Sequence, residues 1–410
     1  MGEARPGAGH AMKLRNYLRG LLYPSRRAEE LQAQLEELRR QTPVPVFWLF
    51  GKTQSGKTTL IKYLTGAEDA EIGAGFRPTT RYSRQYQFPS AEAPLLSFLD
   101  TRGLDEPGYD SAEDIARFHE LAHVVIVTAR VMDHAQERVL AHLQRIREDK
   151  PQRPIILTLT CLHEAYPQQQ HPLPYPFGTA QEAEAVPEDL QRSLAAQRRR
   201  FAGLADVVVP LDITRPEEGF NEPNYGGEQF KQALIDILPA AYRQTLITVE
   251  ETVRKLRTWH DRRALPYILS YSTLAGTAGA IPIPWLSLLV LPGIQSRMVY
   301  HLARLYGQPL EGKRFMELAG SLGLGLVMRQ AVREVVKFIP GVGTLLGSAL
   351  AASSTYALGR ACCYYYSARL AGHVPPPEEL RSLYERELRH AEQLWRKAPP
   401  TNHQPPAQPG

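Results

Sequence analysis

Residues 51–58 read Gly51-Lys52-Thr53-Gln54-Ser55-Gly56-Lys57-Thr58, and this stretch decides the fold. It lies between an apolar run at Val44–Phe50 and a second apolar stretch at Leu60–Leu64. Two glycines with four residues between them, followed by lysine and threonine, form the pattern of a phosphate-binding loop between a strand and a helix. The glycines let backbone N–H groups converge on phosphate oxygens, and the N-terminus of the following helix adds positive potential.

The last two residues of this stretch have separate expected roles. Lys57 supplies a point charge to the β- and γ-phosphate oxygens, and Thr58 offers its hydroxyl to Mg²⁺. A glycine turn with an incidental lysine is disfavoured, because the pattern has its required strand and helix on either side. The nucleotide-binding residues expected in this loop are Gly51, Lys52, Thr53, Gln54, Ser55, Gly56, Lys57, Thr58 and Thr59.

Two further motifs follow in a characteristic order. A strand at Leu95–Leu99 ends in Asp100-Thr101-Arg102-Gly103, and Arg77-Pro78-Thr79-Thr80-Arg81 precedes it. The carboxylate of Asp100 can hold Mg²⁺ through water, and the Gly103 N–H can sense the γ-phosphate. Thr80 is expected to close over Mg²⁺ and the γ-phosphate. Taken singly each motif also suits a turn, but their order after a phosphate loop favours a nucleotide switch.

These motifs together resemble the Era/TrmE branch of the translation-factor-like GTPases. The resemblance rests on the phosphate loop, on residues 78–81 as the first switch and on residues 100–103, and it covers about residues 43–247. It implies GTP and Mg²⁺ as ligands, switch loops around the γ-phosphate and a doubly wound α/β sheet of about six strands. A homodimer formed through the GTPase domain is a further expectation.

The base-recognition segment departs from that family. Members use Asn/Thr-Lys-x-Asp after the fifth strand, whereas here Thr160 is followed by Cys161 and, at the aspartate position, by His163. A histidine cannot accept two parallel hydrogen bonds from guanine. Glu164, one residue later, and Asp212, after the sixth strand, are the two substitute carboxylates. Thr160, His163 and Glu164 are therefore the expected base-side residues, and guanine specificity follows from the resemblance.

The catalytic pattern also lacks a water-orienting group. Leu104 follows the Asp-x-x-Gly motif where Ras-type proteins have glutamine, and the Era/TrmE branch has an apolar residue there. Several members of that branch recruit K⁺ through an asparagine that Gln54 replaces here, so K⁺ is a third candidate ligand. Slow hydrolysis is expected. The expected catalytic residues are Lys57, Thr80 and Gln54, with Arg81 and Arg102 as charge stabilisers.

Strands and helices alternate through the first part of the chain, which predicts a mostly parallel sheet with helices on both faces. The candidate strands are Val44–Phe50, Arg84–Phe88, Leu95–Asp100, His123–Thr128, Ile155–Thr160 and Val207–Leu211. The candidate helices are Lys57–Thr65, Ala112–Glu120, Ala135–Glu148, Leu190–Leu204 and Phe230–Leu246.

The second part of the chain changes character. Ala264–Ser296 contains no charged residue, and Ile281-Pro282-Ile283-Pro284 interrupts it, which favours a re-entrant hairpin or two short helices joined at the prolines. A small-residue helix is expected at Thr344–Leu358, and its small side chains should allow close contact with another helix. About residues 264–372 resemble a domain family of uncharacterised function found in YcjF-type bacterial inner-membrane proteins. Membrane association and a soluble helical core both remain open.

Length and composition set the frame for these motifs. The 410 residues favour two domains, and the net charge of +5 with no dense basic block makes nucleic acid a poor candidate partner. The three cysteines suit neither a zinc site nor a disulfide framework, which favours the cytoplasm. The expected parts are a basic amphipathic helical extension (1–42), the GTPase domain (43–247), a hydrophobic helical domain (248–372) and a charged helix with a disordered Pro/Gln tail (373–410).

Three functions are compatible with this pattern. The first is a slow, Mg²⁺-dependent GTPase acting as a nucleotide switch for a helical module at the inner membrane, with lipid as a partner. The second is a non-hydrolysing nucleotide-binding scaffold at the membrane. The third is an Era-like ribosome- or RNA-associated GTPase, which the lack of a basic patch disfavours.

Overall fold

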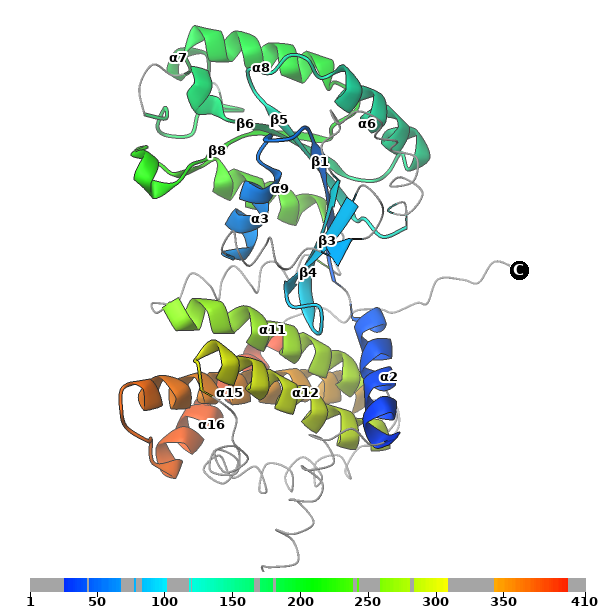
Figure 1. Ribbon diagram of the computed structural model, residues 1–410, viewed down its shortest axis with the longest axis vertical. Helices are drawn as coiled ribbons and strands as arrows, with labels where there is room; N and C mark the ends of the chain where they lie inside the picture. The colour runs from blue at the N-terminus through cyan, green and yellow to red at the C-terminus, as the bar shows by residue number, and fades with distance from the viewer. Residues whose placement is uncertain are drawn as a thin grey trace, which may run out of the picture. The chain divides into compact units, whose positions relative to one another are not determined.

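The computed structural model divides into two compact units. One is formed by Val44–Glu251 and the other by Met1–Pro43 together with Thr252–Gly410 (Figure 1). The structure describes residues 26–42, 44–67, 77–78, 83–101, 118, 120–165, 170–179, 182–238, 242, 259–280, 284–308 and 343–396.

The first unit is built on a sheet whose described strands run in the order β2-β3-β4-β1-β5-β6-β7. Parallel pairing joins β4, β1, β5, β6 and β7 in turn, whereas β2 and β3 are antiparallel at one edge. The predicted doubly wound sheet is confirmed, and the six predicted strands agree with the observed ones to within two residues at each end. The strands are β1 (Val46–Gly51), β2 (Arg77–Pro78), β3 (Ser83–Pro89), β4 (Pro94–Thr101), β5 (Val124–Arg130), β6 (Ile155–Thr160) and β7 (Val207–Pro210).

Helices cover both faces of this sheet because successive residues of each buried strand point to opposite sides. Phe47 and Leu49 of β1 pack in one apolar cluster with α3 (Lys57–Thr65) and α9 (Gly227–Ile237). Trp48 and Phe50 pack in the other with α6 (Glu137–Asp149) and α8 (Glu188–Arg200). Figure 1 shows α6 and α8 on one side of the sheet and α3 and α9 on the other.

The connections carry short elements that sequence patterns did not indicate. They are the 3-10 turns η1 (Leu162–Ala165) and η2 (Pro216–Glu218), the single-turn helix α7 (Glu182–Ala185) and the hairpin of β8 (Asp212–Ile213) with β9 (Asn224–Tyr225). One residue separates the end of β7 from the start of the hairpin, so the hairpin brings Asp212 to the carboxyl edge of the sheet. The helix expected at Ala112–Glu120 lies mostly outside the described residues.

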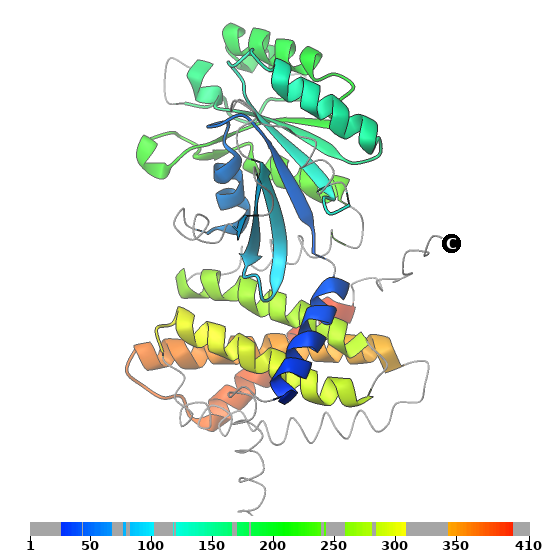
Figure 2. The same cartoon turned by 45° about the vertical axis from the view of Figure 1, so that its right-hand side comes forward.

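The second unit is helical (Figure 2). Its long helix α15 packs against α11, α12 and α16, and α2 packs on α11 and α12. The helix expected in the N-terminal extension therefore belongs to the same compact unit as the C-terminal helices. Thr42, which follows α2, donates its hydroxyl to Thr277 of α11 at 3.1 Å. The helices are α2 (Arg26–Gln41), α11 (Trp259–Ala280), α12 (Pro284–Leu305), α15 (Gly343–Leu370) and α16 (Pro377–Arg396).

The uncharged stretch of the sequence forms two helices. One ends at Ala280 and the next begins at Pro284, as expected for two helices joined at the prolines. Apolar side chains of α11 such as Leu265 and Ile268 are buried within the unit. Among the helices that the structure describes, none combines the length and the apolar character needed to cross a bilayer.

Small residues let α11 and α15 approach closely. A Cβ built on Gly279 would lie 2.6 Å from the carbonyl oxygen of Gly347 and 2.9 Å from the Cβ of Ala351, so only glycine fits there. A Cβ on Gly276 would lie 3.3 Å from the Cβ of Ala352. The close helix contact predicted from the small residues of the segment that forms α15 is confirmed at these positions.

Candidate nucleotide-binding site

The phosphate loop connects the end of β1 to the start of α3. A Cβ on Gly51 would collide with the main-chain oxygen of Thr128 on β5, so the loop begins with a glycine that lets two strands close in. Gly56 precedes α3 at φ 96° and Gln54 has φ 60°, both in the left-handed region. The first turn of α3 contains no acidic residue, which leaves the helix N-terminus suited to an anion.

Two lysines of the loop have different partners. The ammonium of Lys57, which is 9% exposed, donates to the carbonyl oxygens of Gly51 at 3.0 Å and of Lys52 at 2.7 Å. Lys52 instead forms an ion pair with Asp133, which follows β5, at 2.7 Å. Lys57 thus sits over the loop where a triphosphate would bind, while Lys52 anchors the loop to the neighbouring strand connection.

A buried hydroxyl network links this loop to β5 and β6. Ser55 hydrogen-bonds through its hydroxyl to the carbonyl of Lys52 at 2.8 Å and to the hydroxyl of Thr128. Thr160, at the end of β6, donates to the carbonyl oxygen of Ser55 at 2.9 Å. Thr160 therefore joins the base-side segment directly to the phosphate loop, which makes it a positioning residue at both ends of the site.

Asp100 has the environment expected of a metal-binding carboxylate. Its Oδ1 is buried and has no hydrogen-bond partner among the described residues, and burial raises the pKa of Asp100 to about 6 against the opposing charges of Lys57 and Arg84. A buried carboxylate oxygen without a donor suits a cation or its bound water. Thr58 is exposed at the start of α3. The donor set present therefore fits Mg²⁺, with Thr58 and Asp100 as the described residues that would hold it.

The base-side segment is arranged differently from the expectation. Both oxygens of Asp212 face His163, with ring Nδ1 at 2.8 and 2.9 Å and the His163 N–H at 2.7 Å. Glu164 forms an ion pair with Arg130. Both substitute carboxylates are thus engaged by protein groups. Cys161, at the family's lysine position, is a neutral thiol because burial raises its pKa to about 11.

Several expected site residues lie outside the described residues. They are the switch residues Thr79, Thr80, Arg81, Arg102, Gly103 and Leu104. The structure brings together the phosphate loop, Asp100 and the segment from Thr160 to Glu164, all at the carboxyl ends of β1, β4 and β6, where ligands of open α/β sheets bind.

Sequence reasoning missed three contacts of this site. Each contact joins residues that are 49 to 81 positions apart in the sequence. They are the Lys52–Asp133 ion pair, the Ser55–Thr128 hydroxyl contact and the hydrogen bond between Asp212 and His163. The register of parallel strands offers one usable signal, because Thr128 pairs with Gly51 and so must lie beneath the loop.

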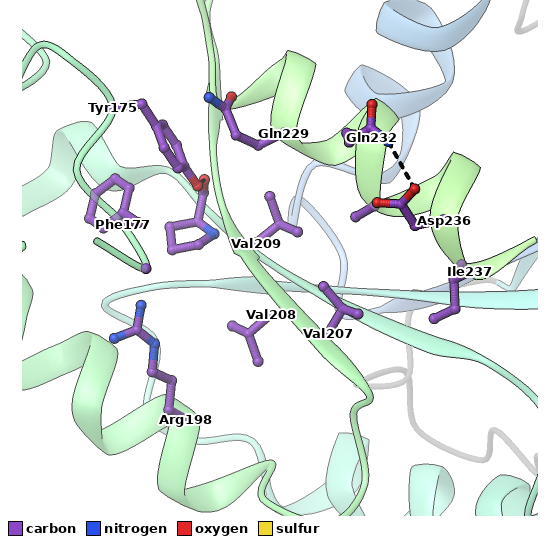
Figure 3. Close-up of a pocket in the computed structure, with 13 residues that line it drawn as sticks. Tyr175, Phe177, Arg198, Val207, Val208, Val209, Gln229, Gln232, Asp236 and Ile237 are labelled. Carbon is purple, nitrogen blue, oxygen red and sulfur yellow. Dashed lines mark hydrogen bonds between the residues drawn. The ribbon is translucent and has the colours of Figure 1, made fainter. Parts of the chain in front are cut away.

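A cavity of about 510 Å³ lies beside β7, the last described strand of the sheet (Figure 3). Its walls come from Val207–Val209, from Tyr175 and Phe177, and from α9, where Gln232 donates to Asp236 at 2.8 Å. It contains no residue of the phosphate loop or of the base-side segment. The cavity is therefore separate from the candidate nucleotide-binding site at the carboxyl edge of the sheet.

Two known family models match separate parts of the chain. Residues 46–161 match the family model described as 50S ribosome-binding GTPase. The chain contains a GTPase domain. Residues 243–374 match a domain of unknown function, DUF697, which includes α11, α12 and α15. A GTPase domain implies GTP as its ligand.

Two individual proteins are similar to parts of the chain. Magnetosome membrane protein 22 of Magnetospirillum gryphiswaldense (strain DSM 6361 / JCM 21280 / NBRC 15271 / MSR-1) is 33% identical over 108 residues, which is 24% of this chain and 55% of that protein. The chain thus spans about half the length of this curated relative. A GTP-binding protein from the archaeon Sulfolobus solfataricus, solved with GDP, is 15% identical, with 52% of this chain and 57% of that chain covered at a TM-score of 0.25.

Proposed function

We propose that this protein is a slow, Mg²⁺-dependent GTPase of the Era/TrmE type whose nucleotide state controls its helical unit. The observation that supports this best is the buried Oδ1 of Asp100, which has no hydrogen-bond partner in the described part of the chain and lies beside the phosphate loop. A carboxyl group in that environment stabilises a cation, and a cation at that place belongs to a bound triphosphate.

The chemistry of the site follows from its residues. Backbone N–H groups at the start of α3 bind the phosphates, and the Lys57 ammonium neutralises the β- and γ-oxygens. Thr58 and Asp100, joined by Thr80 of the switch segment, would hold Mg²⁺, which would add positive charge beside the transferring phosphate. Leu104 cannot orient water, so hydrolysis by the protein alone is slow. Gln54 would hold K⁺, or a second copy of the GTPase domain would approach the site, to supply the missing contact.

For the helical unit we propose peripheral attachment to the cytoplasmic face of a membrane. A relative that carries the name of a membrane protein supports this, as does α12, where Tyr300 is 47% exposed and the Arg304 guanidinium lies 5.9 Å from its ring centre. An exposed aromatic beside an arginine suits the headgroup layer of anionic lipid. The apolar faces of α11 and α15 are buried against each other, so attachment does not require them to enter the bilayer.

One set of measurements tests the switch. Purified protein is expected to bind GTP more tightly with Mg²⁺ than with EDTA, to hydrolyse it slowly, and to float with anionic vesicles to a degree that differs between GDP and a non-hydrolysable GTP analogue. Binding and flotation without any hydrolysis would leave the non-hydrolysing scaffold as the function. Absence of GTP binding would refute the proposal, and binding to ribosomal RNA without flotation would favour the RNA-associated alternative.

A further inference from the structure

His163 takes the sequence position at which the GTPases that this domain resembles have their guanine-binding aspartate, and Asp212 contacts one of its two ring nitrogens. Ring Nδ1 lies 2.8 and 2.9 Å from the two oxygens of Asp212, whose side chain is 3% exposed. An ionised carboxylate only accepts hydrogen bonds, so Nδ1 carries the hydrogen. Nε2 has no hydrogen-bond partner among the described residues, and the His163 side chain is 34% exposed.

We propose that His163 reads the nucleotide base through Nε2 alone, and that Asp212 is the residue that sets the hydrogen-bonding role of this atom. This inference rests on the proposed function, that a purine nucleoside triphosphate occupies the phosphate loop. Thr160, three residues before His163, donates to the Ser55 carbonyl oxygen, which ties the segment that carries the imidazole to the phosphate loop.

The chemistry of one ring nitrogen differs from that of a carboxylate. An aspartate accepts from both N1–H and the 2-amino group of guanine, whereas a neutral imidazole accepts one hydrogen bond at Nε2. Inosine differs from guanosine only in lacking the 2-amino group. GTP and ITP should therefore bind alike here, although a carboxylate reader would lose about 10- to 150-fold with ITP.

Protonation of His163 would reverse the base preference. With a hydrogen on Nε2 the ring donates, which opposes guanine N1–H and matches adenine N1, an acceptor. Three carboxylates, Asp212, Glu164 and Glu218, raise the pKa of His163 against the effect of burial. The other groups that face it are Phe220, at 5.4 Å between ring centres, and His171 beyond that ring. The acceptor form is present above the raised pKa, so preference for GTP over ATP increases as pH rises through it.

The test measures Kd for GTP, ITP and ATP on the full chain between about pH 5.5 and about pH 8.5, a window around the ordinary histidine pKa. The ratio of GTP to ATP affinity is the readout, because titration of the phosphates and of Asp100 affects both nucleotides alike. GTP and ITP are expected within about threefold of each other, and the GTP-to-ATP ratio should rise at least about tenfold over this range.

Two variants and one control separate the roles. His163→Gln should give a ratio that does not vary with pH, whereas Asp212→Asn retains an acceptor for Nδ1–H but removes the charge, so the transition should move to lower pH. His373→Gln, at an exposed histidine of the helical unit, should leave the ratio unchanged. Competition by tripolyphosphate, which has no base, should be equal in all three variants and shows that the phosphate end is intact.

The outcomes distinguish this inference from the proposed function. A GTP preference over ITP above about tenfold, with a ratio that is flat in pH, would overturn the role of His163 while GTP binding stands. Wild-type protein that binds neither tripolyphosphate nor any of the nucleotides would refute the proposed function and this inference with it.

Discussion

Replacement of Lys57 by alanine is the most direct test of the phosphate site. The Lys57 ammonium already makes two charge-assisted hydrogen bonds to loop carbonyls, at 3.0 and 2.7 Å, and is held over the place where the phosphates would lie. A charge-assisted bond contributes about 1.5–3 kcal/mol, so loss of two such bonds to the β- and γ-oxygens costs about 3–6 kcal/mol. This corresponds to a rise in the Kd for GTP of about 10²- to 10⁴-fold.

The assay is isothermal titration with GTP and Mg²⁺, with thermal unfolding followed by circular dichroism. Lys62→Ala is the matched control, because it removes the same charge from the last turn of the same helix α3 and should leave the Kd within about threefold. The lost carbonyl bonds should also lower the stability of the ligand-free Lys57→Ala protein by about 1–3 kcal/mol. A folded Lys57→Ala protein with wild-type affinity would refute the assignment of the phosphate site.

Three further outcomes are expected. Gln54→Ala should abolish any stimulation of hydrolysis by K⁺ over Na⁺, measured as phosphate release, and cation stimulation that survives the change would exclude Gln54 as the ligand. Thr160→Val should weaken GTP binding about 5- to 10-fold, because it removes the buried bond to Ser55, and an unchanged Kd for GTP would contradict its positioning role. Tyr300→Ser combined with Arg304→Gln should reduce flotation with anionic vesicles at least about threefold, whereas unchanged flotation would exclude this part of α12 from lipid contact.

Short-range pattern was sufficient for much of the fold. Strand β6 and helix α3 have the bounds that the apolar runs predicted, because a buried parallel strand and a helix after a phosphate loop are both signalled by neighbouring residues. The two-residue strand β2 has no such signal, since its pairing with β3 depends on position at the sheet edge. The helix predicted at Phe230–Leu246 differs at both bounds from α9, which begins at Gly227 and ends at Ile237.

The contacts of the base-side segment could not be predicted from the sequence. The replacement of aspartate by His163 is visible in the sequence, but its consequence depends on Asp212, 49 residues later, which the β8–β9 hairpin carries to the same edge. Sequence reasoning treated Asp212 and Glu164 as carboxylates that substitute for the aspartate. In the structure Asp212 contacts His163, and Glu164 forms an ion pair with Arg130. The two carboxylates therefore contribute only indirectly to recognition of the base.

The close approach of α11 and α15 gives the helical unit its own test. Gly279→Ala places a methyl group 2.6 Å from the Gly347 carbonyl oxygen, and overpacking of this kind costs about 1–3 kcal/mol. Gly276→Ala is the matched control, because its methyl group would meet Ala352 at 3.3 Å and both changes gain the same helix propensity of about 1 kcal/mol. The difference between the two variants therefore isolates the helix contact.

Urea unfolding followed by circular dichroism should show Gly279→Ala to be less stable than Gly276→Ala by about 1–3 kcal/mol. Gly279→Ala is expected to be the less stable variant because its clash involves main-chain atoms of a neighbouring helix, which cannot move aside as a flexible side chain would. Equal stability of the two variants would mean that α11 and α15 do not pack at this crossing in solution. The uncharged faces of both helices would then be open to other contacts. Insertion of these helices into the bilayer would then be an alternative to peripheral attachment.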